Sequence, residues 1–149
     1  MRIWRIAQTP YTDLTGEGAR LYGGRWNSPG RPMVYTAENP ALAALEIRVH
    51  LDIPPELQPD NYVLIAIETG NAAINEMPSD IQDPRAAGDN WLSQLSSPIV
   101  RVPSIIVPES YNFLINPRHP ASPQISVEFT KPISFDPRLW ALESGPPLI

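Results

Sequence analysis

Glycine and arginine residues are interspersed between positions 18 and 31, and this mixture is typical of a turn that binds phosphate. The glycines stand at positions 18, 23, 24 and 30, and the arginines at positions 20, 25 and 31. Glycine allows positive φ and lets a ligand approach the backbone, while the guanidinium fork matches phosphate oxygens. We expect Arg25 to contact a ligand because it directly follows Gly24, and we expect Arg20 and Arg31 to be surface charges.

A carboxylate at position 46 is the second candidate for chemistry. Asn39-Pro40 is a typical helix start, and in the helix that follows, Leu42, Leu45 and Val49 share one face with Glu46. Burying an unpaired carboxylate is costly. The sequence therefore predicts that Glu46 either takes part in function or forms an ion pair.

Composition narrows the class of protein. The 149 residues fit one domain, and the absence of cysteine excludes disulfides and thiol nucleophiles. Two histidines argue against a histidine-rich metal site, so we expect no metal. A formal net charge of −5 argues against direct binding of nucleic acid. With neither a signal-peptide pattern nor a long apolar run, we expect a soluble, cytoplasmic protein that makes no membrane contact.

Short apolar runs separated by prolines predict an α+β fold, a single compact domain with a mixed short-stranded sheet and few helices. We expect residues 13–24 to form an irregular loop and residues 71–89 to form a long polar excursion. The domain would span residues 1–149, with its core at about 4–140 and a short C-terminal tail. The expected strands are 2–6, 33–36, 62–67, 99–102, 105–107, 112–115 and 124–130, and the expected helices are 40–51 and a short one capped by Asp89 or Asn90.

Several motifs, taken together and in order, resemble the RES domain family. They cover nearly the whole chain, from about Trp4 to Leu139. The matching segments are Trp4-Arg5-Ile6, Gly23-Gly24-Arg25-Trp26-Asn27, Val34-Tyr35-Thr36-Ala37, Ala44-Leu45-Glu46 with His50, Arg101-Val102-Pro103-Ser104, Asn116-Pro117 with His119-Pro120, and Phe135-Asp136-Pro137-Arg138-Leu139.

The resemblance implies an ADP-ribosyltransferase-like fold and the toxin of a type II toxin–antitoxin pair. Such toxins deplete cellular NAD by hydrolysis or phosphorolysis of the nicotinamide–ribose bond. NAD would then be a substrate, with inorganic phosphate as a second substrate in phosphorolysis, and no cofactor would be needed. The implied partner is an Xre-like helix-turn-helix antitoxin, which we expect to occlude the active site.

The resemblance also implies a phosphate-binding role for Arg5 and Arg25, which could grip the pyrophosphate of NAD while the backbone around Gly24 assists. Each arginine has a structural alternative. Arg5 would be a solvated charge on an open strand face, and Arg25 would tie down its own loop by donating to carbonyl groups.

Tyr35, Glu46 and Ser104 complete the implied site. Tyr35 could stack on nicotinamide, or it could be an ordinary core aromatic. Glu46 could stabilise the positive charge that develops as nicotinamide leaves, or it could brace the fold by pairing with Arg5 or Arg25. Ser104 could bind a ribose hydroxyl or the nicotinamide amide, or it could satisfy backbone groups at a strand break; we do not expect it to be a nucleophile.

Two other functions remain open on sequence alone. The same pocket could transfer ADP-ribose to a protein, or the chain could be a non-catalytic module that binds its antitoxin. A homodimer is also open, since we expect Trp91 and Trp140 to be exposed aromatic residues that would suit an interface. We expect His50, Asn116 and His119 to stabilise loops.

Overall fold

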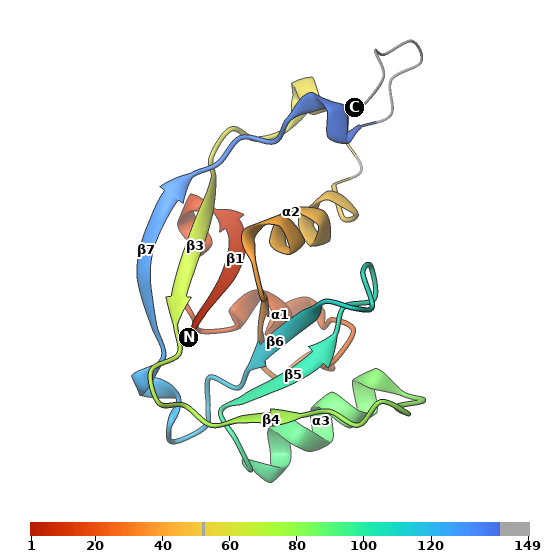
Figure 1. The fold of residues 1–149 in the computed structure, drawn as a ribbon, viewed down its shortest axis with the longest axis vertical. Helices are drawn as coiled ribbons and strands as arrows, with labels where there is room; N and C mark the ends of the chain where they lie inside the picture. Colours follow the sequence, from red (N-terminus) through yellow and green to blue (C-terminus); the bar gives the residue numbers. More distant parts are fainter. Residues whose placement is uncertain (52, 141–149) are drawn as a thin grey trace.

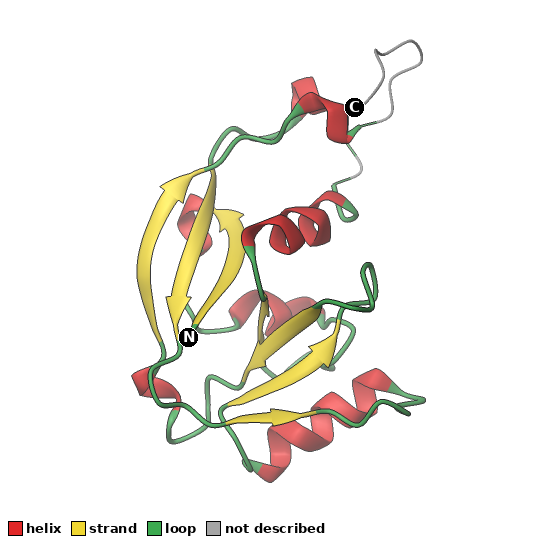
Figure 2. Cartoon of the chain, viewed as in Figure 1, coloured by secondary structure: helices red, strands yellow, loops and turns green. Residues whose placement is uncertain are grey.

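The computed structural model of the protein describes residues 1–51 and 53–140, and its centre is a seven-stranded sheet (Figures 1 and 2). The spatial order of the strands is β4-β5-β6-β2-β1-β3-β7. All neighbours pair antiparallel except β4 and β5, which are parallel. The strands are β1 Arg2–Gln8, β2 Val34–Ala37, β3 Tyr62–Glu68, β4 Ile74–Glu76, β5 Ile99–Pro103, β6 Tyr111–Ile115 and β7 Ser126–Pro132.

Three α-helices accompany the sheet in the described ranges. They are α1 Glu17–Tyr22, α2 Pro40–Arg48 and α3 Pro84–Gln94, with short 3-10 turns at Thr9–Tyr11, Pro55–Leu57, Ser122–Gln124 and Pro137–Leu139. Asparagine and aspartate side chains start the two longer helices. Asn39 accepts a hydrogen bond from the N–H of Leu42, and Asp83 accepts one from Ala86. Each cap satisfies one of the donors that a helix start leaves open.

The sheet nearly separates into two halves between β1 and β2. These two strands pair at a single position, Trp4 opposite Ala37, whereas β1 and β3 pair along seven consecutive residues. Figure 1 shows the consequence, because β1, β3 and β7 form one group of strands while β6, β5 and β4 form a second group. Strand β2 belongs to this second group through its pairing with β6. A cleft can open where neighbouring strands part in this way.

Apolar side chains cover both faces of the sheet. One face carries a continuous buried cluster that includes Ile3, Ile65 and Phe113. Ile125, which precedes β7, also belongs to it. On the other face α3 packs through Trp91 against β5 and β6, and α2 packs through Leu42 against β1 and β3. Period-two alternation along the strands separates the cluster on one face from the two clusters on the other, as expected for a sheet buried on both sides.

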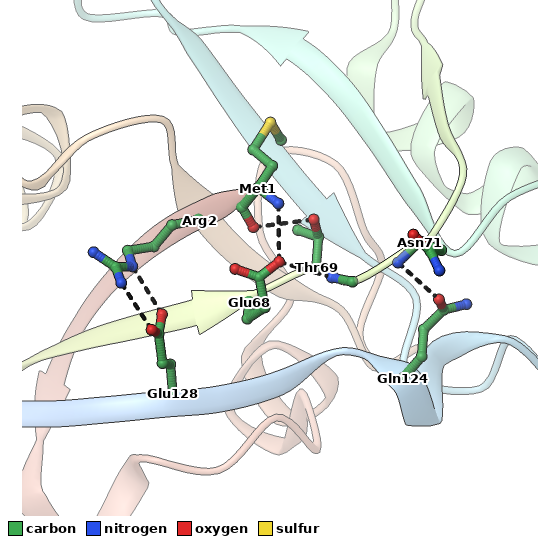
Figure 3. Close-up of polar contacts among 8 residues, drawn as sticks. Met1, Arg2, Glu68, Thr69, Asn71, Gln124 and Glu128 are labelled. Atoms are coloured by element: carbon green, nitrogen blue, oxygen red, sulfur yellow. Dashed lines mark hydrogen bonds and ion pairs between the residues drawn. The ribbon is translucent and has the colours of Figure 1, made fainter.

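Polar contacts hold together the N-terminal end of β1, the end of β3 and β7 (Figure 3). Arg2 forms a two-pronged ion pair with Glu128, with both nitrogen–oxygen distances 2.8 Å. The Met1 amino group donates to Glu68 at 2.9 Å, and the buried Thr69 donates through its N–H and hydroxyl to the Met1 carbonyl. The ion pairs are exposed and contribute little individually.

The predicted α+β class and mixed sheet are confirmed, and most predicted strands lie within two residues of those observed. Residues 105–107 are the exception, since they form a bend after β5 and not a strand. The predicted strand at 124–130 is displaced to β7, where a register shift opposite Ala66 and Ile67 interrupts the alternation. The predicted C-terminal tail, which follows the core that ends at about residue 140, lies outside the described residues.

The predictions for the segments that contain α1, β4 and α3 need correction. The segment 13–24 contains α1, which glycines with positive φ, Gly16 and Gly23, enclose at its two ends. The long excursion 71–89 contains β4 and the first half of α3. The second predicted helix corresponds to α3, which is capped by Asp83 and not by Asp89 or Asn90. Asp89 instead accepts hydrogen bonds from Ser28.

The proposed exposure of the two tryptophans is also corrected. Trp91 is 6% exposed and donates to Ser97 within the core, so it offers no interface. Trp140 is half-buried beneath the Arg48 guanidinium, whose carbon lies 4.7 Å from the ring centre.

Replacing Gly88 with alanine is expected to destabilise the fold by about 3 kcal/mol or more. A Cβ atom at this position of α3 would meet the Trp26 carbonyl oxygen at 1.7 Å, so the helix or the glycine-rich loop after α1, residues 23–31, must move. Gly18→Ala is the matched control, because nothing lies within 4 Å of its added Cβ and alanine favours α1. Urea unfolding monitored by tryptophan fluorescence measures both. Equal stability of the two variants would contradict the close contact.

Candidate functional site

A cleft of about 1000 Å³ lies where the two halves of the sheet part. Its walls come from β1, β2 and β6, from the glycine-rich loop with α1, from α2, and from the start of α3. Most of the residues predicted for the site line it, namely Arg5, Gly24, Arg25, Tyr35 and Glu46. Ser104 does not line the cleft, although its neighbours Pro103 and Ile105 do.

The glycine-rich loop is held in shape by Asn27, which is 0% exposed. Its amide nitrogen donates to the carbonyl groups of Ala19 and Arg31, each at 2.8 Å, and its amide oxygen accepts from the Tyr35 hydroxyl at 2.6 Å. A buried amide with donors and acceptor all paired fixes the backbone around it. The loop is therefore formed before any ligand arrives.

Tyr35 and Gly24 are in contact at the cleft wall. A Cβ at Gly24 would lie 2.5 Å from the Tyr35 hydroxyl, so only glycine fits there. The same hydroxyl accepts a hydrogen bond from the Trp26 N–H at 3.0 Å. Burial, slightly offset by that bond, raises the pKa of Tyr35 to about 12. The phenol is thus neutral and engaged in holding the loop, while the residue still lines the cleft.

Arg5 is neither a solvated charge nor a free anion receptor. Its Nη1 donates to the carbonyl groups of Tyr11 and Asp13 at 2.9 and 3.0 Å, which fixes the segment after β1. Burial lowers the pKa of Arg5, with Asp13 opposing that effect. Nε and Nη2 have no hydrogen-bond partner among the described residues, so the guanidinium keeps donors for a ligand.

Arg25 is exposed on the cleft wall and makes no side-chain hydrogen bond or ion pair to the described part of the chain. It does not tie down its own loop, which is the structural alternative considered above. The other two loop arginines are engaged elsewhere. Arg20 pairs with Glu17, and Arg31 donates to the Asp89 carbonyl and to Ser93.

Glu46 and Ser104 come together from α2 and from the end of β5. The Ser104 hydroxyl donates to a Glu46 carboxylate oxygen at 2.9 Å. It also accepts from the N–H groups of Ile106 and Val107, both at 3.1 Å, and Ser104 is 2% exposed. The hydroxyl therefore fulfils the structural role considered for it and orients the carboxylate as well.

The predicted apolar stripe around Glu46 is only partly correct. Leu42 is buried, but Leu45 and Val49 are 37% and 56% exposed. The side of α2 that faces inward carries Ala43, Glu46 and Ile47, all of which line the cleft. Among residues 1–51 and 53–140, Glu46 forms no ion pair, so its charge faces the cleft without a cation in contact.

Two contributors to the site escaped the sequence analysis. Arg85 lines the cleft from α3 and donates through Nε and Nη2 to the Gly24 carbonyl, at 3.2 and 3.1 Å. Asp89, one helical turn after Arg85, accepts a hydrogen bond from the N–H of Ser28 at 2.8 Å. Both lie about 60 residues from the loop in sequence, and no local pattern indicates that they reach it.

The three additional motif residues differ in their roles. Asn116 donates to the Leu92 carbonyl at 3.2 Å, and both ring nitrogens of His119 are bonded to backbone groups, so these two residues stabilise loops. His50 instead lines the cleft beyond Glu46. In the described ranges no three His, Asp or Glu side chains are grouped to hold a metal ion, and no helix there has the length and apolar character to span a bilayer.

The split sheet and its cleft define a known fold. The structure superposes on a chain in the crystal structure of the M. tuberculosis MbcT-MbcA toxin-antitoxin complex with a TM-score of 0.68, over 93% of this chain and 85% of that one. Identity in that comparison is 18%, so it establishes the fold alone.

Sequence comparisons identify the family. The RES domain matches residues 2–138, and this chain belongs to the RES domain family. It is 38% identical to a protein named Toxin Res from Pseudomonas putida, over 90% of this chain and 98% of that protein. It is 35% identical to a Prs ADP-ribosylating toxin from Sphingobium sp., over 92% of this chain and 95% of that protein.

Alkaline pH is expected to reduce the stability of the parent protein more than that of Tyr35→Phe. The pKa of Tyr35 in the folded state, about 12, exceeds the value of about 10 in an unfolded chain. The neutral phenol therefore contributes fully below pH 10, and its contribution is lost as the pH rises toward 12. Between about pH 9 and pH 11.5 the parent should lose about 2 kcal/mol more than the variant in urea unfolding. Parallel losses would show that Tyr35 ionises normally.

Proposed function

We propose that this protein is the toxin of a toxin–antitoxin pair and that it depletes NAD by breaking the nicotinamide–ribose bond. Family membership and the names of its relatives support the first part. One observation carries the second: Glu46, held by Ser104 and with no cation in contact among the described residues, faces a cleft that Arg5 and Arg25 also line. A carboxylate facing arginines across a cleft suits a substrate with a cationic and an anionic end.

The pyrophosphate is the anionic end of this substrate. Arg25 has no partner among the described residues, and Arg5 keeps Nε and Nη2 available after fixing the Tyr11–Asp13 segment. Guanidinium groups bind phosphate oxygens through paired, charge-assisted hydrogen bonds. With the loop already ordered by Asn27, binding would cost little conformational entropy.

The carboxylate of Glu46 would act on the nicotinamide ribose. As the carbon–nitrogen bond breaks, its electron pair leaves with nicotinamide, which becomes neutral, and positive charge develops on the ribose. A carboxylate already oriented by Ser104 stabilises that charge without reorganising. An acceptor oxygen then bonds to the ribose carbon and passes its proton to Glu46 or to solvent. NAD is therefore a substrate, and the scheme requires no cofactor.

Tyr35 would bind the nicotinamide ring through the face of its own aromatic ring. Its hydroxyl is bonded to Asn27 and Trp26, so it is not free to act as an acid or base. Its ring lines the cleft, and the electron-rich face of an aromatic ring attracts a cationic ring. We assign Tyr35 to substrate binding and loop support.

The acceptor of ADP-ribose is water or inorganic phosphate in this proposal. A protein acceptor is the second candidate, because a relative that is 35% identical is named a Prs ADP-ribosylating toxin. Labelled NAD separates these outcomes. Label on a protein indicates transfer, free ADP-ribose indicates hydrolysis, and a phosphate-dependent product indicates phosphorolysis.

The proposed partner is an Xre-like helix-turn-helix antitoxin that covers the cleft, in the cytoplasm where NAD is available. Large apolar side chains surround the cleft in exposed positions, with Tyr11 62%, Tyr22 83% and Ile105 59% exposed. A partner seated there would bury apolar surface and exclude NAD in one step. Direct contact with nucleic acid is left to the antitoxin, in keeping with the net charge of −5.

Glu46→Gln is expected to lower kcat for NAD cleavage about 100-fold or more, with little change in KM. Glutamine keeps an oxygen for Ser104 to donate to and removes the negative charge at nearly constant size, so the variant tests the electrostatic contribution. Proton NMR follows nicotinamide release. Glu56→Gln, at an exposed position of the 3-10 turn Pro55–Leu57, is the control. If Glu46→Gln turns over NAD at the parental rate, this site assignment is wrong.

Ser104→Ala is expected to lower kcat about tenfold and stability by about 1–3 kcal/mol. The carboxylate loses its orienting donor, and the N–H groups of Ile106 and Val107 lose their acceptor. Ser126→Ala, at an exposed position of β7, controls for the loss of a hydroxyl. Kinetics and urea unfolding are both measured, and a variant with lowered stability but normal kcat would limit Ser104 to the structural role.

A further inference from the structure

The guanidinium of Arg85 uses only some of its hydrogen-bond donors among the described residues. Nε and Nη2 donate to the Gly24 carbonyl, whereas Nη1 has no partner within the described ranges. The side chain is exposed, lines the cleft and forms no ion pair with any described carboxylate. A two-point hold on one carbonyl also fixes the plane of the guanidinium, which makes its remaining donors directional.

A second uncompensated arginine lies directly beside this contact. Arg25 follows Gly24, whose carbonyl Arg85 holds, and it too lines the cleft without any partner among described residues. Neither guanidinium is paired with a carboxylate of the described residues, and a phosphoryl oxyanion is the kind of group that compensates such a charge. The hydrogen bonds to Gly24 fix Arg85 next to the residue that Arg25 follows.

Nearby carboxylates do not supply that anion. The Asp83 side chain caps α3 by accepting from the Ala86 N–H, and Asp13 accepts from Thr15. Glu17 is paired with Arg20. None of these three cleft-lining carboxylates is paired with Arg25 or Arg85, and neither is Glu46, so among the described residues the charge of the two arginines is available to a ligand.

We propose that Arg85 and Arg25 together form a phosphoryl-binding site, with Arg85 held in position by the Gly24 carbonyl. This inference rests on the proposed NAD-cleaving function for its physiological ligand, and it adds a substrate-binding residue from α3. The ligand chemistry is a phosphoryl oxyanion. Its source is either the pyrophosphate of the dinucleotide or free inorganic phosphate acting as acceptor.

The test is calorimetric binding of two probes, ADP-ribose and inorganic phosphate, to the parent protein and to three variants. Arg85→Gln keeps a donor for the Gly24 carbonyl and removes the charge, while Arg85→Lys keeps the charge. Arg118→Gln removes one charge from an exposed arginine that does not line the cleft. Thermal unfolding of each variant is measured in parallel.

We expect Arg85→Gln to weaken binding of one probe about tenfold or more, Arg85→Lys to retain most of the affinity, and Arg118→Gln to bind as the parent does. Weakened ADP-ribose binding identifies the pyrophosphate as the ligand, and weakened phosphate binding with normal ADP-ribose affinity identifies the acceptor. Unchanged affinity of Arg85→Gln for both probes overturns the proposal. Equal losses in the glutamine and lysine variants, accompanied by lower unfolding temperatures, also overturn it, because Arg85 would then only brace the loop.

These outcomes are separable from those of the NAD experiment. If the parent protein leaves NAD intact but Arg85→Gln binds ADP-ribose weakly, the phosphoryl site stands and the cleavage proposal fails. If the parent consumes NAD and Arg85→Gln has normal affinity for both probes and a normal KM, cleavage stands and the site fails.

Discussion

The site depends on the short backbone pairing between β1 and β2. A single pair, Trp4 and Ala37, joins the two halves of the sheet, and beyond it the strands part. Arg5 lies on the same face of β1 as the buried residues Ile3 and Ala7. Glu46 comes from α2, which packs on the other face beside Ile6. The two side chains line one cleft because continuous strand pairing no longer separates the faces. A fully paired sheet would keep them apart.

Long-range polar contacts give the cleft its rigid wall. The glycine-rich loop has few apolar residues of its own, yet Asn27 satisfies its carbonyl groups, Tyr35 satisfies its N–H, and α3 holds it through Asp89 and Arg85. These bonds use up the polar groups that would otherwise require water. Arg25 is left out of this network, and the geometry thus separates the residues that build the loop from one that faces solvent.

Local patterns predicted the parts of the fold that depend on local physics. Apolar runs located β3, β5 and β6, and Asn39-Pro40 located the start of α2. The start of α3 was missed because Asp83 and Asp89 are equally good caps in sequence, and only the distant Ser28 decides between them. For the site, motif resemblance supplied Arg5, Gly24, Arg25, Tyr35, Glu46 and Ser104. It could not reveal that Ser104 bonds to Glu46 across 58 residues, or that Arg85 reaches Gly24.

The edges of the sheet affect how the chain behaves among its own copies. β4, one edge, is only three residues long, and β7, the other, carries a register shift opposite Ala66 and Ile67, a lysine at 131 and a proline at 132. Short, bulged or charged edges are poor templates for an incoming strand. Both edges therefore disfavour edge-to-edge aggregation of newly made copies, and they favour contacts between chains that use side chains over contacts that use backbone pairing.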